Sequence, residues 1–271
     1  MSFRSRKARV AGEWTVSAME MTSDGSNSST TTSAFGGSTG SGTNKGNSKF
    51  DGTNMTETSS WTSVSGSSNS SGSTTATGGS VTTTQVNNGV SGTPRTGTYS
   101  NTGSITMTFE KDGAYKSTTS FKKKIVYSPV APSTTTTTQT EDEDETVEGT
   151  WAFIGKDKAN EFKNKERIGI WYKSRTIKTT STDNKTYTGG SDGATTVNTG
   201  TVSGKNSAPD EVWEIVQLKS KEMKIISNGE WNSSTTSNTT YTESPGVPQA
   251  ASGGTGTNKN TFKMSATLTA K

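Results

Sequence analysis

Leucine is nearly absent from this chain: only Leu218 and Leu268 occur among its 271 residues. Helical bundles and coiled coils bury leucine-rich stripes on one helix face, so the sequence excludes both classes. Apolar residues make up only 25% of the chain, and no run of them approaches the roughly 18 residues of a transmembrane helix. The apolar residues instead alternate with polar ones, which is typical of β-strands.

Residues 261–270 show this alternation most clearly. Phe262, Met264, Ala266 and Leu268 fall on one face, and polar residues fall on the other. The pattern predicts a half-buried antiparallel strand. Near the start of the chain, residues 14–18 alternate in one phase and residues 19–21 in the other, and this change of phase predicts a β-bulge.

A hairpin is predicted where Ile105, Met107 and Phe109 alternate before the turn dipeptide Asp112-Gly113. Several such short strands without helical periodicity predict an all-β, antiparallel up-and-down barrel of about eight or nine strands in one domain, residues 1–271. We expect residues 14–21 to pair with residues 261–270 and close the barrel. Only residues 157–164 could make a helical turn.

Four segments are rich in Ser, Thr, Gly and Asn and poor in apolar side chains. So little apolar surface cannot offset the entropy cost of ordering a packed core, and we therefore expect long polar loop insertions that add little stability. The segments are residues 22–104, 129–145, 179–210 and 232–259.

Catalytic side chains are scarce because the chain has neither histidine nor cysteine. A Ser–His–Asp triad and a thiolate site are therefore excluded, and no nucleophile elbow or phosphate loop is present. The acidic run 141–145 lacks the spacing and the glycine of a calcium loop, and we interpret it as a solvated loop. We expect no enzymatic activity, no catalytic residue, no cofactor and no metal site; calcium binding at the scattered loop residues Asp183, Asp192 and Asp210 is the alternative that the sequence leaves open.

The six tryptophans are interpreted as core, because one buried indole removes a large apolar area from water and aliphatic side chains are few. A tryptophan-lined sugar or lipid site is the alternative. The predicted structural core consists of Trp14, Trp151, Trp213, Phe109, Phe262 and Leu268.

The order of several short motifs resembles the lipocalin-like domains of Bacteroidota cell-envelope lipoproteins. The motifs are Gly12-Glu13-Trp14, Phe50-Asp51-Gly52-Thr53, a hairpin at 109–113, Gly149-Thr150-Trp151, and the segments 213–218, 221–225 and 261–270. The resemblance implies a lipocalin-like barrel in the cell envelope, at the outer membrane or the cell surface. It implies no ligand, and because cysteine is absent we expect any lipid anchor to precede Met1.

The net charge of +4 is small, and no aromatic residues interleave with the basic ones, so we expect no nucleic-acid partner. The leading hypothesis is a non-enzymatic envelope or surface protein that acts as a binding or accessory subunit and contacts a protein partner through its long loops. The alternative is a lipocalin-type carrier that holds a small apolar ligand in the barrel mouth.

Overall fold

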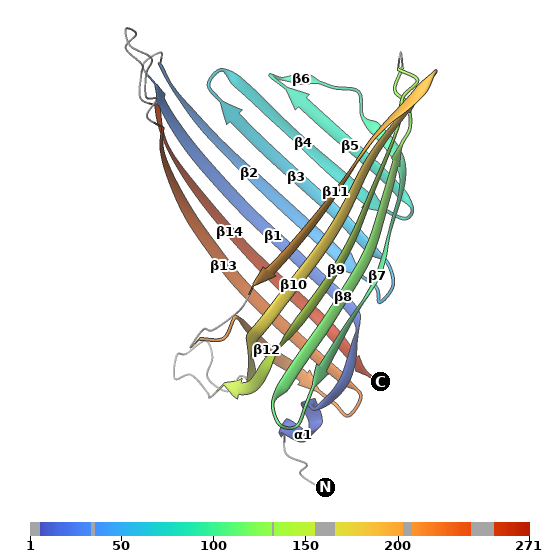
Figure 1. Cartoon of the computed structure of the whole chain (residues 1–271), viewed down its shortest axis with the longest axis vertical. Coiled ribbons are helices and arrows are strands. Elements are labelled where there is room, and N and C mark those ends of the chain that lie inside the picture. Colours follow the sequence, from blue (N-terminus) through green and yellow to red (C-terminus); the bar gives the residue numbers. More distant parts are fainter. Residues whose placement is uncertain (1–5, 34–35, 132, 155–165, 203–207, 240–251) are drawn as a thin grey trace.

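A tall, flared β-barrel with a short helix at its narrow end is the architecture of the computed structural model (Figure 1). The structure describes the whole chain except residues 1–5, 34–35, 132, 155–165, 203–207 and 240–251. The predicted helical turn at 157–164 lies outside the described residues. No helix in the described part of the chain is long and apolar enough to cross a membrane.

One helix and fourteen strands make up the described secondary structure. They are α1 (Arg6–Val10), β1 (Gly12–Ser33), β2 (Gly36–Phe50), β3 (Met55–Ser65), β4 (Ser68–Thr77), β5 (Ser80–Asn87), β6 (Val90–Ser91), β7 (Arg95–Phe109), β8 (Ala114–Tyr127), β9 (Thr136–Ile154), β10 (Glu166–Tyr187), β11 (Gly190–Val202), β12 (Glu211–Leu218), β13 (Glu222–Thr239) and β14 (Ser252–Ala270).

The barrel is all-β, antiparallel and closed, and each strand pairs with the next one along the ring. Twelve strands form it, with β6 and β11 outside, so the expectation of eight or nine strands is wrong. Near the narrow end, β1 also pairs directly with β7, through Gly12↔Phe109 to Thr15↔Thr106. The ring there closes through eight strands, and β2 to β5 widen it to twelve above this level.

Closure between the first and last strands is confirmed. Trp14 pairs with Ala270 and Val16 with Leu268, in antiparallel register. The register shifts between Val16 and Ala18, which confirms the bulge that the change of phase predicts. The hairpin at Asp112-Gly113 is also present: Gly113 has a φ of 106°, a conformation that glycine adopts without strain, and the Asp112 carboxylate accepts from the Ala114 N–H.

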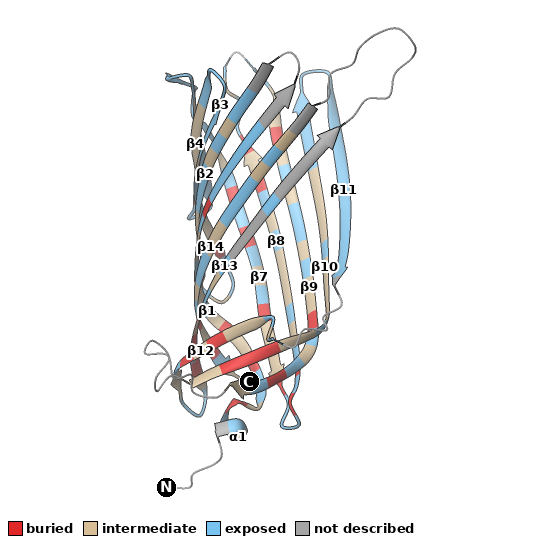
Figure 2. Cartoon of the chain, turned by 90° about the vertical axis from the view of Figure 1, so that its left-hand side faces the viewer, coloured by how far each residue is buried: buried red, intermediate tan, exposed pale blue. Residues whose placement is uncertain are grey.

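The main core fills the eight-strand end of the barrel, where most buried positions gather (Figure 2). Helix α1 lies at this end, and its last residue, Val10, is fully buried. The indole N–H of Trp14 donates to the carbonyl of Val10 over 2.8 Å. Because this bond satisfies the polar atom of the indole, both side chains can be excluded from water.

Five of the six predicted core residues lie in this core: Trp14, Trp151, Trp213, Phe109 and Leu268 are at most 3% exposed. The prediction for Phe262 is wrong, because its side chain is 42% exposed. It shares the inward phase of Leu268 but lies six residues further along β14 from the core. There the wider ring no longer surrounds it with apolar neighbours.

The four segments expected as polar loops are largely strands. Residues 22–104 contain most of β1, all of β2 to β6 and most of β7; the later segments run into β9, β10, β11, β13 and β14. The backbone hydrogen-bond ladder continues from the core into these segments, and threonine has a high propensity for strands. Cross-strand hydroxyl pairs such as Thr43–Thr62 and Thr182–Thr195 link these polar strands.

Candidate ligand cavity

A cavity of about 350 Å³ lies inside the barrel, bordered below by Tyr115 and Trp213 of the main core. Its lining comes from both the eight-strand ring and the inserted strands β2 and β3. The cavity therefore lies where the ring begins to widen, and its upper wall exists because β2 to β5 are inserted between β1 and β7.

Methionine dominates one side of the cavity. Five of the seven methionines in the chain line it: Met19 and Met21 of β1, Met55 of β3, Met107 of β7 and Met264 of β14. Met21 and Met264 are register partners on adjacent strands. Unbranched thioether side chains adapt their shape to different apolar groups, so this wall suits an apolar ligand of loosely defined shape.

The acidic run 141–145 forms another side of the cavity. It lies within β9, so the interpretation as a solvated loop is wrong. Successive side chains of a strand point to opposite faces; accordingly Glu141, Glu143 and Glu145 line the cavity, whereas Asp142 and Asp144 lie between them and are exposed. The carboxylates of β9 therefore share the cavity with the methionines of β1, β3, β7 and β14.

Two cavity carboxylates have polar partners near the core. The guanidinium of Arg175 on β10 donates to Glu145, and this ion pair raises the pKa of Arg175 although burial alone would lower it. Glu211 accepts from the Tyr172 hydroxyl and, over 2.8 Å, from the Trp213 indole N–H.

Burial dominates the titration of this group of side chains. It raises the pKa of Glu211 despite the two hydrogen bonds, and it raises the pKa of Tyr172 above its usual range. The neutral form of Tyr172 therefore persists at every physiological pH and keeps donating to Glu211. The hydrogen bond between Tyr172 and Glu211 therefore holds both side chains in place between the cavity and the main core.

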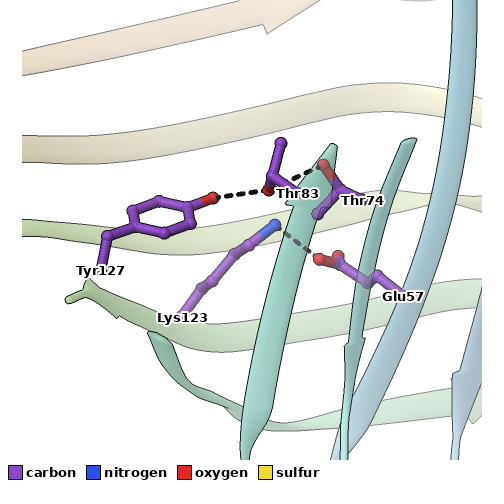
Figure 3. A network of polar contacts seen from close by, with 5 residues as sticks. All are labelled: Glu57, Thr74, Thr83, Lys123 and Tyr127. Carbon is purple, nitrogen blue, oxygen red and sulfur yellow. Dashed lines mark hydrogen bonds and ion pairs between the residues drawn. The ribbon is translucent and has the colours of Figure 1, made fainter. Parts of the chain in front are cut away.

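A polar network crosses the barrel interior from β8 to the inserted strands (Figure 3). The Lys123 ammonium on β8 donates to Glu57 of β3 over 2.5 Å, and Tyr127 shares a 3.2 Å hydrogen bond with Thr83 of β5. Neither β3 nor β5 is a sheet neighbour of β8. These contacts therefore tie the inserted strands to β8 on the interior side of the strands that lie between them.

Acceptors that line the cavity without a hydrogen bond or ion pair among the described residues include the Glu143 carboxylate and the Asn101 side-chain oxygen. Glu143 is half-buried; burial raises its pKa, and the neighbouring Glu145 and Glu141 raise it further. Asn101 is only 7% exposed and lines the cavity, and its side-chain oxygen is buried without a donor. A buried acceptor without a donor costs free energy, so both groups are available to a ligand.

The sequence did not point to this site. Trp213 is the only predicted core residue that also lines the cavity; Trp14, Trp151, Phe109 and Leu268 are core only, and the exposed Phe262 does not line it. The alternation of acid residues at 141, 143 and 145 was the available signal, since in a strand it places three carboxylates on one face. Among the described residues, no group of three or more acidic side chains is arranged to hold a metal ion.

No family model matches this chain, and no curated protein matches it either.

Proposed function

We propose that the protein is a non-enzymatic binding barrel that holds a small, largely apolar ligand in its interior cavity. The observation that carries the proposal is the convergence of five methionines on one cavity in a chain with few apolar residues. A protein that needed only a filled core would use these side chains to fill it. The cavity volume of about 350 Å³ lies within the range of small-molecule sites, which is roughly 300–1,000 Å³.

The other expectation, contact with a protein partner through long loops, has no specific support. The segments that were expected to supply those loops are mostly strands of the barrel wall. We therefore rank the carrier function first.

We keep the cell envelope as the proposed location. The support is the resemblance of the sequence motifs to envelope lipoproteins. The outer wall of the barrel has exposed ion pairs such as Lys116–Glu148 and Lys49–Glu20, as is usual for a surface in water. Fractionation of native cells, followed by detection of the protein in membrane and cytoplasmic fractions, tests this location.

Isothermal titration of the full chain with n-decanol tests the carrier function. We expect saturable binding at one site per chain. The cavity variant is Ser117→Phe, because Ser117 lines the cavity and a phenyl ring there would occupy it. We expect at least tenfold weaker binding of decanol by this variant.

The matched control is Thr118→Phe, which places the same ring on the adjacent, exposed position of β8. We expect this variant to bind decanol as the parent does. Absence of saturable decanol binding by the parent chain would overturn the carrier function. Equal binding by Ser117→Phe and the parent would show that decanol binds elsewhere.

A further inference from the structure

The cavity has more negative than positive side chains, and its positive ones are already paired. Five carboxylates line it, those of Glu57, Glu141, Glu143, Glu145 and Glu211, against two cations. Lys123 is paired with Glu57 and Arg175 with Glu145. Neither cation is therefore available to an anionic ligand without breaking an existing ion pair.

We infer that the ligand is a cationic amphiphile: an apolar body that carries one protonated amine, bound with the amine at Glu143 and the apolar body against the methionines. The inference rests on the proposed carrier function and adds the chemical class of the ligand. An ammonium group has three donors and no acceptor. It therefore matches a cavity that presents unsatisfied acceptors such as the Glu143 carboxylate and the Asn101 oxygen.

Glu143 is the best placed of these acceptors for an amine. Its register partner on β8 is Phe121, which also lines the cavity, and its partner on β10 is Thr179. A positive charge next to Glu143 would offset the repulsion from Glu141 and Glu145, which now raises its pKa. The Phe121 ring offers an apolar and weakly cation-attracting surface beside the same carboxylate.

A bare metal ion fits this wall poorly. Carboxylates at alternate positions of one strand are about 6.6–6.8 Å apart along it, whereas calcium needs six to eight oxygens within about 2.3–2.6 Å. Among the described residues no acidic group of that kind exists. An ammonium on an apolar body needs only one or two acceptors and gains further from the methionine wall.

Calorimetric titration of the full chain at neutral pH with three probes of equal chain length tests the inference. The probes are decylammonium, n-decanol and decanoate, at constant ionic strength. We expect decylammonium to bind at least tenfold more tightly than decanol, and decanoate to bind most weakly. The variant Glu143→Gln should reduce the amine-to-alcohol affinity ratio at least threefold and leave decanol binding unchanged.

The control variant is Asp144→Asn, which removes the same charge from the adjacent, exposed position of β9, and it should leave the affinity ratio unchanged. If decanol binds as tightly as decylammonium, or decanoate binds best, the inferred ligand class is wrong while the carrier function stands. If decylammonium is preferred but Glu143→Gln and Asp144→Asn lower the ratio equally, long-range charge causes the preference and the placement at Glu143 is wrong. If none of the three probes binds, the carrier function itself fails.

Discussion

The indoles of Trp14 and Trp151 show how single residues hold the narrow end of the barrel together. Each is 2% exposed, and each donates its N–H to a backbone carbonyl: Trp14 to Val10, and Trp151 to Glu110 over 2.9 Å. The Trp151 ring also meets the Phe109 ring edge-on, with centroids 5.4 Å apart. Apolar burial, a satisfied polar atom and aromatic contact therefore coincide in the same side chains.

Replacing either tryptophan by alanine should lower the free energy of unfolding by about 3–5 kcal/mol, the usual cost of removing a buried large aromatic side chain. Urea melts of Trp14→Ala and Trp151→Ala measure this loss. Trp61→Ala is the matched control, because Trp61 is only partly buried on β3 and should cost clearly less. Unfolding of both core variants at the parent midpoint would show that these indoles do not stabilise the fold.

Glu143 should make stability depend on pH in a distinctive way. Its pKa in the folded state is above the ordinary value of 4.5, so folding favours the protonated form and the ionised carboxylate destabilises the fold at neutral pH. Glu141 and Glu145 on its own strand add to this effect, and Arg175 of β10 opposes it. Lys123 of β8 also lines the cavity but is paired with Glu57.

The variant Glu143→Gln should therefore be more stable than the parent at pH 7, by less than about 1 kcal/mol because solvent screens a half-buried group. The gain should vanish as the pH falls through the folded-state pKa of Glu143 toward 4.5. Urea melts between pH 4 and pH 8 measure the difference. Asp144→Asn should show no such trend, and a gain for Glu143→Gln that persisted at the acid end would contradict the assignment.

The alternation of apolar and polar residues predicts only part of the environment of a single side chain. Alternation indicates which face of a strand a side chain occupies, and it placed Phe262 and Leu268 correctly on one face. It does not indicate how far along the barrel axis the packed core extends. Leu268, within the core, is fully buried, whereas Phe262, six residues further along β14, is 42% exposed.

Among the elements, the polar hairpins were the hardest part to predict. Their composition suggested loops, because few side chains in them can be buried. The available signal was the turn residues: Asn88 and Gly89 have φ values of 48° and 78°, and Gly78 and Gly79 have 58° and 81°. Two successive positive φ values are the signature of the tight turns that join paired strands. The turns recur at short intervals, which indicates consecutive hairpins even where apolar alternation is missing.

Two hairpin tips of the barrel allow a matched test of which polar strands stabilise the fold. The β4–β5 tip contains Ala76 and Val81, which are 2% and 1% exposed and form a second, small core with Tyr99, Ile125 and Tyr127. The β10–β11 tip, by contrast, is exposed from Asp183 to Thr201. The two hairpins therefore differ in burial although both end in a two-residue turn.

Removing the two cross-strand pairs next to each turn should have unequal effects. Deletion of Ala76, Thr77, Ser80 and Val81 should lower the Tm by about 5 °C or more, because it removes two buried apolar side chains. Deletion of Thr186, Tyr187, Ser191 and Gly190 should change the Tm by less than about 2 °C, since no buried group is lost. Differential scanning calorimetry measures both; equal losses would show that ladder length, not burial, sets the stability.

For the whole molecule, the sequence predicted a closed antiparallel barrel but not its width. The strands with regular apolar alternation are those that enclose the main core, and the eight-strand ring near α1 consists of β1, β7 to β10 and β12 to β14. The strands β2 to β5 bury few side chains, so alternation could not reveal them. The cavity depends on these strands for Met55, Ser48 and Glu57, and it was therefore not predictable either.

The direct pairing of β1 with β7 below the inserted hairpins also bears on how such a barrel could change over generations. Because the narrow end closes without β2 to β5, whole hairpins can be gained or lost between β1 and β7 while the folding core keeps its register. Each such event adds or removes two strands and widens or narrows the interior in one step. Interior volume, and with it the size of molecule that fits, can thus diversify independently of the part that keeps the chain folded.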